Sequence, residues 1–379
     1  MSITRAWQSR RGQVAVVIIA LIAAGVGFGG SSSSNAQATD SPAGSALSDT
    51  KPLSSQVALD QTLAFLNSNV EPKKTYRLAY LAECYANNPY CIAKFNGVQA
   101  AAKKFGATVK LYDANFSATN QNKQVQDAVN EGFDGYIFGP AAQVPGCAMW
   151  NKYLKPTGKP VGLEDIPICN NPDWTPGSVG FVGFQTQANF DAEHDHDLKE
   201  ACGTNPCQAL SVSGFLGSDL YNMWSKATEN AVAKNPNVEL VTKTIPAEFS
   251  APKAYGLVLD MLRRNPGVKV ILSHDDNMST GIVRAIRAAG KEPNTDIKVY
   301  SQGGPQIGLD MISRGEATGT VNLLPYEEGE YSAAQVLRYL IEGKTTPGWV
   351  NLADAKKIKD GPGTIYITKA NVDKAQPEY

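Results

Sequence analysis

Short apolar segments of this chain end repeatedly in polar or aromatic residues, and this pattern constrains the fold more than any other feature. The residues that follow four of these segments are 83–90, Asp165, 274–276 and Gln302. In an open parallel sheet, ligands bind beyond the carboxyl ends of the strands. The pattern therefore predicts a cleft for a small polar molecule, lined from several strand ends.

Predicted strands and helices alternate from residue 76 onward, in two successive series. The predicted strands are 78–82, 109–112, 136–138, 161–163 and 179–182, then 209–213, 239–241, 270–272, 298–300 and 318–321. The predicted helices are 92–105, 121–131, 148–154, 188–202, 220–235, 251–265, 278–289 and 307–314. Strict alternation with apolar strands indicates parallel sheets covered by helices on both faces. We therefore predict an α/β protein with two doubly wound parallel-sheet lobes.

The two series define the expected domain boundaries. Residues 39–75 are expected to form a flexible tether and one surface helix, because the first part is rich in Ser, Ala, Asp and Pro. The N-terminal lobe is expected to comprise 76–183 plus 324–345. The C-terminal lobe is expected to comprise 184–323 plus 346–379.

The first 38 residues have the layout of a secretory signal. Arg5, Arg10 and Arg11 precede the uncharged apolar stretch 14–30, and a small-residue site at 36–38 follows. This order predicts cleavage after Ala38. An uncleaved membrane anchor stays open, because 17 residues is the lower limit for spanning a bilayer. The formal net charge of −1 gives no electrostatic case for binding nucleic acid.

Six cysteines beyond the signal support an oxidising compartment. Their spacing favours pairing of neighbours, although six cysteines allow 15 connectivities. The favoured pairs are Cys84 with Cys91, Cys147 with Cys169, and Cys202 with Cys207. No metal site is predicted, because the cysteines have no Cys-x-x-Cys spacing and the histidines lie elsewhere. The stretch 191–197, rich in Asp and His, is interpreted as a solvated helix face, since His194 and His196 are two residues apart.

Several short motifs occur in the order typical of one family. They are Asn88-Pro89-Tyr90, Phe133-Asp134-Gly135-Tyr136-Ile137, Asp275-Asp276-Asn277-Met278-Ser279-Thr280-Gly281, and Leu324-Pro325-Tyr326-Glu327-Glu328-Gly329. Because of these motifs and their order, the chain resembles the ribose-binding-protein-like (type I) periplasmic solute-binding proteins over about residues 76–375. The resemblance implies two lobes joined by a three-strand hinge. It also implies that the lobes close on a sugar that an ABC import permease then receives.

The resemblance, together with the strand ends, assigns candidate ligand-binding residues. Aromatic rings are expected against the C–H faces of a sugar, with carboxylates and amides on its hydroxyls. The candidates are Asn87, Tyr90, Asp165, Asn222, Phe249, Asp275 and Gln302, with Trp224 and His274 as additional ones. His274 would make binding sensitive to pH. For each candidate a structural role stays open, such as a helix cap for Asp165 or Asp275 and core packing for Phe249 or Trp224.

The departures from the family pattern concern its arginines. Ile166 and Asn222 stand where ribose binders commonly carry Arg, and Leu323 stands where Gln is frequent. Without these two guanidinium groups, the site lacks many of the bidentate hydrogen bonds that would hold a small pentose. The ligand is thus left open among a different sugar, a polyol and a less polar solute.

We interpret the chain as an exported, periplasmic or extracytoplasmic solute-binding protein for a sugar or polyol, acting as a monomer with an ABC permease. No cofactor is predicted, and no nucleophile elbow, Walker loop or dinucleotide motif supports an enzyme. Two alternatives stay open. One is a sensory protein that signals to a membrane receptor, and the other is an exported carbohydrate-acting enzyme.

Overall fold

The computed structural model describes residues 51–86, 88–354 and 363–379. The predicted export signal at 1–38 and the candidate Asn87 lie outside the described residues. Within the described ranges, no helix is both long enough and apolar enough to cross a lipid bilayer.

The first lobe is built on a six-stranded sheet whose strands are all parallel. In spatial order the strands are β12 (Trp349–Asn351), β5 (Gly180–Gly183), β4 (Val161–Glu164), β3 (Gly135–Phe138), β1 (Arg77–Ala82) and β2 (Thr108–Asp113). Its helices are α1 (Ser55–Leu66), α2 (Pro89–Lys104), α3 (Ala118–Glu131), α4 (Gln143–Met149) and α10 (Pro325–Glu342).

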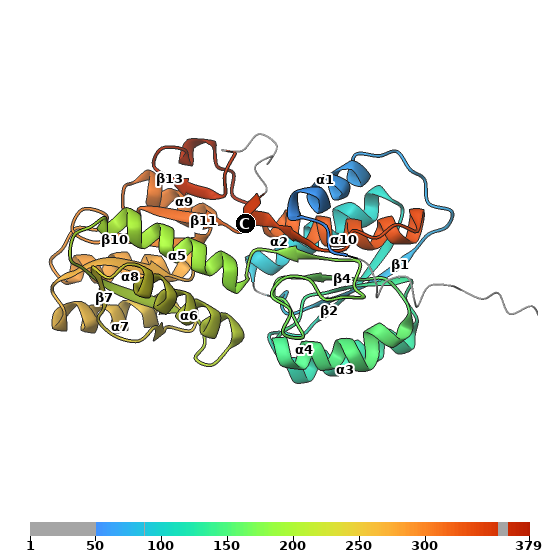
Figure 1. Cartoon of the computed structure of the whole chain (residues 1–379), viewed down its shortest axis with the longest axis horizontal. Coiled ribbons are helices and arrows are strands. Elements are labelled where there is room, and N and C mark those ends of the chain that lie inside the picture. Colours follow the sequence, from blue (N-terminus) through green and yellow to red (C-terminus); the bar gives the residue numbers. More distant parts are fainter. Residues whose placement is uncertain (1–50, 87, 355–362) are drawn as a thin grey trace, which may run out of the picture. The chain divides into compact units, whose positions relative to one another are not determined.

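The second lobe has a seven-stranded sheet in which only β13, among the strands described, runs antiparallel to its neighbour. The main path is β13 (Tyr366–Thr368), β11 (Gly319–Asn322), β10 (Lys298–Gly303), β9 (Val268–Ser273), β6 (Cys207–Ser213) and β7 (Val238–Leu240), with β8 (Ile245–Pro246) on β6. Its helices are α5 (Gln187–Cys202), α6 (Asp219–Lys234), α7 (Ala251–Arg264), α8 (Asp276–Ala288) and α9 (Gln306–Ser313). The prediction of two parallel-sheet α/β lobes is therefore confirmed (Figure 1).

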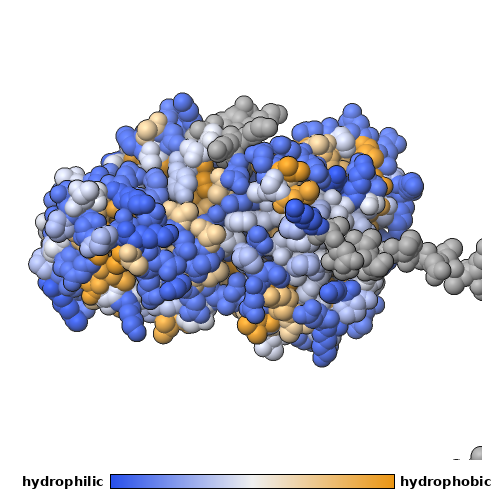
Figure 2. All heavy atoms as spheres, viewed as in Figure 1, coloured by the Kyte–Doolittle hydropathy of each residue, from blue (hydrophilic) through white to orange (hydrophobic). Residues whose placement is uncertain are grey.

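Each sheet is buried on both faces, as the apolar strands predicted. In β1, Leu78 and Tyr80 belong to the cluster that α2 and α10 cover, whereas Ala79 and Leu81 belong to the cluster that α3 covers. This alternation follows from the two-residue period of a strand. Polar residues dominate the face of the molecule seen in Figure 2, and the apolar residues there form separate small groups.

Side chains in the strand–helix loops cap the N-termini of many of the helices. The N-cap side chain accepts a backbone N–H bond at six helices, and such caps stabilise helices by about 1 kcal/mol each. The capping residues are Asn88, Ser117, Thr186, Ser218, Ser250 and Asp275. Because these loops leave the carboxyl ends of strands, the caps also fix the backbone at the cleft.

The chain passes between the two sheets three times, after β5, after β11 and after β12. The third passage corrects one predicted boundary. Residues 346–351, which the sequence analysis assigned to the second lobe, lie with the first, because β12 extends the first sheet beside β5. Thr346 also donates its N–H to the Val179 carbonyl of this lobe at 3.0 Å.

Two segments pack more deeply than the sequence analysis predicted. Helix α1 buries Leu59 and Phe65 against the first lobe, with the Phe65 and Phe105 rings stacked at 4.4 Å. The solvated-face interpretation of 191–197 is wrong for the inner side of α5, where Glu193 and His194 are fully buried. That side faces the second lobe, and the His194 ring lies 4.1 Å from the Trp224 ring.

Candidate functional site

A cavity of about 760 Å³ lies between the lobes at the carboxyl ends of their strands. This volume is within the range usual for small-molecule sites. The first lobe lines it with residues that follow β1, β2 and β4, the second with residues that follow β6, β8, β9 and β10. The polar and aromatic residues of the lining are Glu83, Asn88, Tyr90, Phe116, Asp165, Gln185, Phe215, Glu248, Phe249, His274, Asp275, Asn277, Gln302, Gln306 and Tyr379.

Six of the predicted ligand-binding residues line this one cavity: Tyr90, Asp165, Phe249, His274, Asp275 and Gln302. Asn222 does not, because it lies on the exposed side of α6 and its Nδ2 donates to the Gly217 carbonyl at 3.3 Å. Trp224 is 1% exposed, and its Nε1 donates to Ser211 Oγ at 3.0 Å inside the second lobe. The structure therefore places Asn222 and Trp224 outside the cavity lining.

Asp165 projects from the loop after β4 in a left-handed backbone conformation, with φ of 70°. Its Oδ1 accepts a hydrogen bond from Gln185 Nε2. Gly183 allows the close packing of this loop, because a Cβ there would lie 3.0 Å from the Asp165 carbonyl oxygen. Gln185, where the chain first passes between the lobes, thus holds the carboxylate of Asp165, which retains acceptor positions for a ligand.

Asp275 has both of the roles that the sequence left open. Its Oδ1 accepts the Met278 N–H at 2.8 Å as the N-cap of α8, and the residue also lines the cavity. Burial raises the pKa of Asp275 to about 7, and the backbone N–H bond only partly opposes this rise. Near neutral pH the side chain is therefore present both as an acid that can donate a hydrogen bond and as a carboxylate that accepts one.

His274 is neutral at physiological pH, which corrects the prediction that it would make binding sensitive to pH. Burial lowers the pKa of His274 to about 3. Its Nδ1 shares a hydrogen bond of 2.7 Å with Ser213 Oγ, and its ring stacks on Trp224 at 4.3 Å. Nε2 has no hydrogen-bond partner among the described residues. His274 can thus offer one ring nitrogen to a neutral ligand.

Gln302 has a side-chain amide without any hydrogen-bond partner among the described residues. It is the next-to-last residue of β10, it is 1% exposed, and neither Oε1 nor Nε2 has a partner among the residues that the structure describes. A buried amide without partners is costly, by about 1–3 kcal/mol for each group. This cost makes the amide well suited to pairs of ligand hydroxyls, which can both donate and accept.

Phe249 forms an aromatic wall on the second lobe. Its backbone is left-handed, with φ of 52°, and its ring lies at an angle of 61° to His274 with centroids 5.5 Å apart. A Cβ at position 214 would lie 2.1 Å from the Phe249 ring, so only glycine fits beneath it. The ring thus packs against the core of the second lobe, as the structural alternative predicted, and it also lines the cavity.

A buried ion cluster inside the first lobe was not predicted. Lys94 Nζ lies 2.6 Å from Glu83 Oε1 and 3.3 Å from Glu164 Oε1, and Tyr80 donates to Glu164 at 2.7 Å. Burial acts to lower the pKa of Lys94, but Glu164 and Glu83 outweigh it, so the pKa lies well above its ordinary value. Burial raises the pKa of Glu83 to about 7. The only sequence signal was the position of Glu83 directly after β1.

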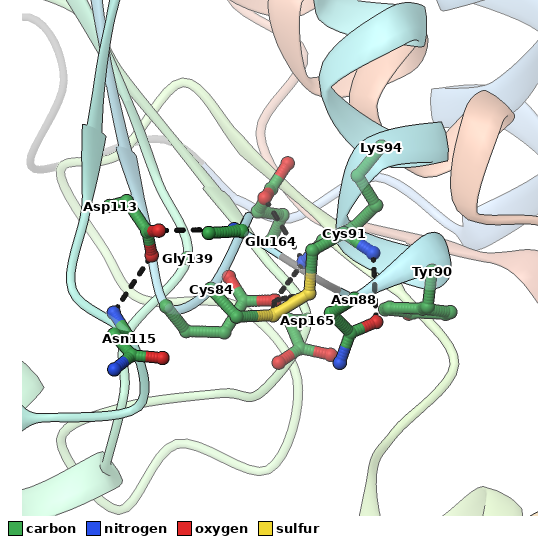
Figure 3. The surroundings of a disulfide bond; sticks show 12 residues. Cys84, Asn88, Tyr90, Cys91, Lys94, Asp113, Asn115, Gly139, Glu164 and Asp165 are labelled. Carbon is green, nitrogen blue, oxygen red and sulfur yellow. Dashed lines mark hydrogen bonds and ion pairs between the residues drawn. A yellow bond between two sulfur atoms is a disulfide. The ribbon is translucent and has the colours of Figure 1, made fainter.

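Tyr90 lies beside this cluster, with Lys94 Nζ 5.4 Å from the centroid of its ring. The Tyr90 hydroxyl donates to Glu328 Oε2 at 2.6 Å, which ties the aromatic residue of the first lobe to α10. The Cys84–Cys91 disulfide links the end of β1 to the first turn of α2 beside it (Figure 3). Cys147–Cys169 and Cys202–Cys207 are also bonded, so the structure has all three predicted pairs. The oxidised sulfurs near Glu83 offer no thiolates to a metal ion.

Among the described residues, all the Asp, Glu, Lys and Arg side chains that line the cavity are acidic. The lining contains Glu83, Asp165, Glu248 and Asp275, and no Lys or Arg among the described residues that form it. This agrees with the missing arginines noted in the sequence. Such a cavity suits a neutral molecule rich in hydroxyl groups and disfavours an anion.

Two α/β lobes with a solute-sized cavity between them define a two-lobe solute-binding protein. The chain matches the periplasmic binding protein domain over residues 80–345, which is more than half of its length, and it belongs to that family. The family is one of solute-binding proteins rather than enzymes, and membership implies an exported protein.

Individual relatives are distant in sequence. The D-allose-binding periplasmic protein of Escherichia coli is 24% identical over 282 residues, which cover 72% of this chain and 86% of that protein. The galactofuranose-binding protein of the same organism is 27% identical over 243 residues, which cover 62% and 74%. A solute-binding protein of Burkholderia graminis in complex with D-arabinose has a TM-score of 0.67 at 16% identity, covering 80% of this chain and 98% of that one. At this identity the structural likeness establishes the fold alone.

Proposed function

We propose that the protein captures a sugar or sugar-like polyol between its lobes and delivers it to an ABC import permease. The observation that carries the proposal is the lining of the cavity, in which the partnerless amide of Gln302 lies with carboxylates and aromatic rings and without a guanidinium or ammonium group. Relatives whose names specify D-allose, galactofuranose and ribose support the same ligand class.

The ligand would favour closure of the two lobes by contacting both of them. Tyr90 and Asp165 belong to the first lobe, and Phe249, Asp275 and Gln302 to the second. A solute that contacts both sets binds the closed arrangement better than the open one and shifts the population toward it. Periplasmic binding proteins are standard examples of such hinge closure.

The N-terminal segment and the oligomeric state belong to the same proposal. We expect residues 1–38 to direct export, with cleavage after Ala38, and a chain that keeps them to be held at the membrane. We expect the exported protein to act as a monomer. Mass spectrometry of the secreted chain and light scattering of the purified protein test these two points.

The ligand is tested by a thermal-shift panel of pentoses, hexoses and polyols, combined with mass spectrometry of compounds that copurify. A ligand raises the melting temperature by mass action, so a true ligand gives a shift that grows with its concentration. The transport role is tested by measuring uptake of the same compound in a deletion strain. Loss of uptake is expected, and uptake at the normal rate would contradict the importer role.

A further inference from the structure

The C-terminal segment of the sequence reaches into the cleft, which nothing in the sequence pattern predicted. After β13 and the short 3₁₀ helix Val372–Lys374, the chain continues to Tyr379, which lines the same cavity as Asp165, Asp275 and Gln302. Figure 1 marks this end of the chain between the two sheets.

The last two residues are held by helices of different lobes. The N–H of Gln306, in the first turn of α9, donates to the Tyr379 carbonyl at 3.2 Å. The N–H of Tyr326, in the first turn of α10, donates to Glu378 Oε2 at 2.7 Å. Neither helix has a side-chain cap of its own, because their N-cap residues are Pro305 and Leu324. The segment therefore supplies acceptors for backbone N–H groups that lack a partner within a helix.

The Tyr379 ring lies among groups already assigned to the site. It meets the Tyr90 ring edge to face, with centroids 5.9 Å apart and an interplanar angle of 86°. At Gly303 the backbone has φ of 129°, and a Cβ there would lie 2.9 Å from the Tyr379 hydroxyl, so glycine leaves room for the phenol. Burial, followed by the charges of Asp276 and Asp275, raises the pKa of Tyr379 well above its usual value. The hydroxyl is thus a protonated donor.

We propose that Tyr379 is a ligand-contacting residue, and that Glu378 is a positioning residue that holds it in the cleft. The two tyrosine rings form an apolar corner for the C–H face of a sugar, and the Tyr379 hydroxyl donates to a ligand oxygen. This proposal rests on the proposed sugar-binding function. It predicts that removing the ring weakens binding, whereas a segment that merely blocks the cleft would strengthen binding when the ring is removed.

Calorimetry of the exported chain, unfolded and refolded to remove bound solute, tests the proposal with D-allose, D-ribose and myo-inositol as probes. Tyr379→Ala should weaken binding of the tightest probe about tenfold or more, since a buried aromatic contact is lost. Tyr379→Phe keeps the ring and should cost only about twofold to tenfold, the value of one hydrogen bond. Tyr255→Ala, at a partly buried tyrosine of α7 that does not line the cavity, is the matched control and should bind like the wild type.

Two variants test whether Glu378 holds this C-terminal segment in place. Glu378→Ala removes the acceptor of the Tyr326 N–H, releases the segment and should weaken binding, whereas Glu378→Gln keeps an amide oxygen for that N–H and should weaken binding less than Glu378→Ala does. Affinity in Tyr379→Ala equal to or above that of the wild type overturns the proposal. Native mass spectrometry of freshly exported protein separates this result from failure of the proposed function. If the wild type carries a compound that is not a carbohydrate and Tyr379→Ala loses it, the ligand class is wrong and the role of Tyr379 stands.

Discussion

Asp165 and Asp275 line the cavity from opposite lobes, so each should contribute to binding on its own. We predict that Asp165→Ala and Asp275→Ala each weaken sugar binding about tenfold to a hundredfold, because a hydrogen bond to a charged group contributes about 1.5–3 kcal/mol. Calorimetry with the tightest sugar of the panel measures the effect. Asp127→Ala, an exposed position of α3, is the control. Wild-type affinity in both cleft variants would remove these residues from the site.

The raised pKa of Asp275 predicts how the stability of the ligand-free protein depends on pH. The carboxyl ionises near 3.8 when unfolded but near 7 when folded. Its contribution to stability is therefore fully present below about pH 4 and is lost as the pH rises toward 7, by up to about 1.4 kcal/mol per pH unit. Glu83 has a pKa of about 7 for the same reason and adds to the decline.

The variant Asp275→Asn isolates this effect, because an amide oxygen can still cap α8 but does not ionise in this range. Its free energy of unfolding should fall less steeply than that of the wild type between pH 4 and pH 7. Urea unfolding at several pH values measures both curves, with Asp127→Asn as the control. Parallel curves for the wild type and Asp275→Asn would show that Asp275 is not the group responsible.

Residues at strand ends were predictable from the sequence, whereas residues on helices were not. The carboxyl end of a strand in a parallel sheet faces the cleft whatever the neighbouring helices do, which is why Asp165, Asp275 and Gln302 lie in the cavity lining. Which side of α6 faces inward depends on its packing, and the structure buries Trp224 and exposes Asn222. Tyr379 lies on no regular element and could not be placed at all.

At the scale of elements, the Cys84–Cys91 disulfide fixes the junction of β1 and α2, which contributes both cysteines and Tyr90 to the cavity. We predict that replacing both cysteines by alanine lowers the free energy of unfolding by about 2–3 kcal/mol, the loop-closure value for a short loop. The same variant should also weaken sugar binding, because the loop that carries Tyr90 becomes less restricted. Chemical denaturation and calorimetry measure the two effects.

Cys202–Cys207 offers the matched control for this prediction. It joins the end of α5 to the start of β6, at the end of the strand remote from the cleft, and its loop is similarly short. Its double alanine variant should lose about 2 kcal/mol of stability and bind sugar normally. Equal affinities in the two double variants would mean that the first disulfide stabilises the fold without shaping the site.

Most helices and strands could be predicted from the alternation of apolar segments, but the elements that each one packs against could not. The predicted strand 78–82 corresponds to β1 and the predicted helix 278–289 to most of α8. By contrast, the short strand β12 joins a sheet whose neighbouring strand β5 ends 166 residues earlier, and no local pattern indicates that pairing. The contact of Lys94 with Glu164 likewise depends on how α2 packs on the first lobe.

At the scale of the whole described chain, the two lobes touch outside the cavity as well as around it. The N–H of Gln143, at the start of α4, donates to Asp219 Oδ2 at the start of α6 at 2.7 Å. Asp219 does not line the cavity, so it can affect a ligand only through the approach of the lobes. A contact of this kind contributes to affinity by stabilising the closed population rather than by touching the solute.

Asp219→Ala should therefore weaken sugar binding although the site itself is intact. We expect a decrease of about tenfold, because the variant loses one hydrogen bond to a charged group that forms only when the lobes approach. Small-angle X-ray scattering of a chain beginning at residue 39 measures closure directly. Added sugar should reduce the radius of gyration, with a midpoint that matches the calorimetric dissociation constant, and the midpoint of Asp219→Ala should move to higher sugar concentration. Glu229→Ala, an exposed position of the same helix, should titrate like the wild type. Binding detected by calorimetry with no change in scattering would contradict closure, and an unchanged midpoint in Asp219→Ala would show that this contact does not stabilise the closed state.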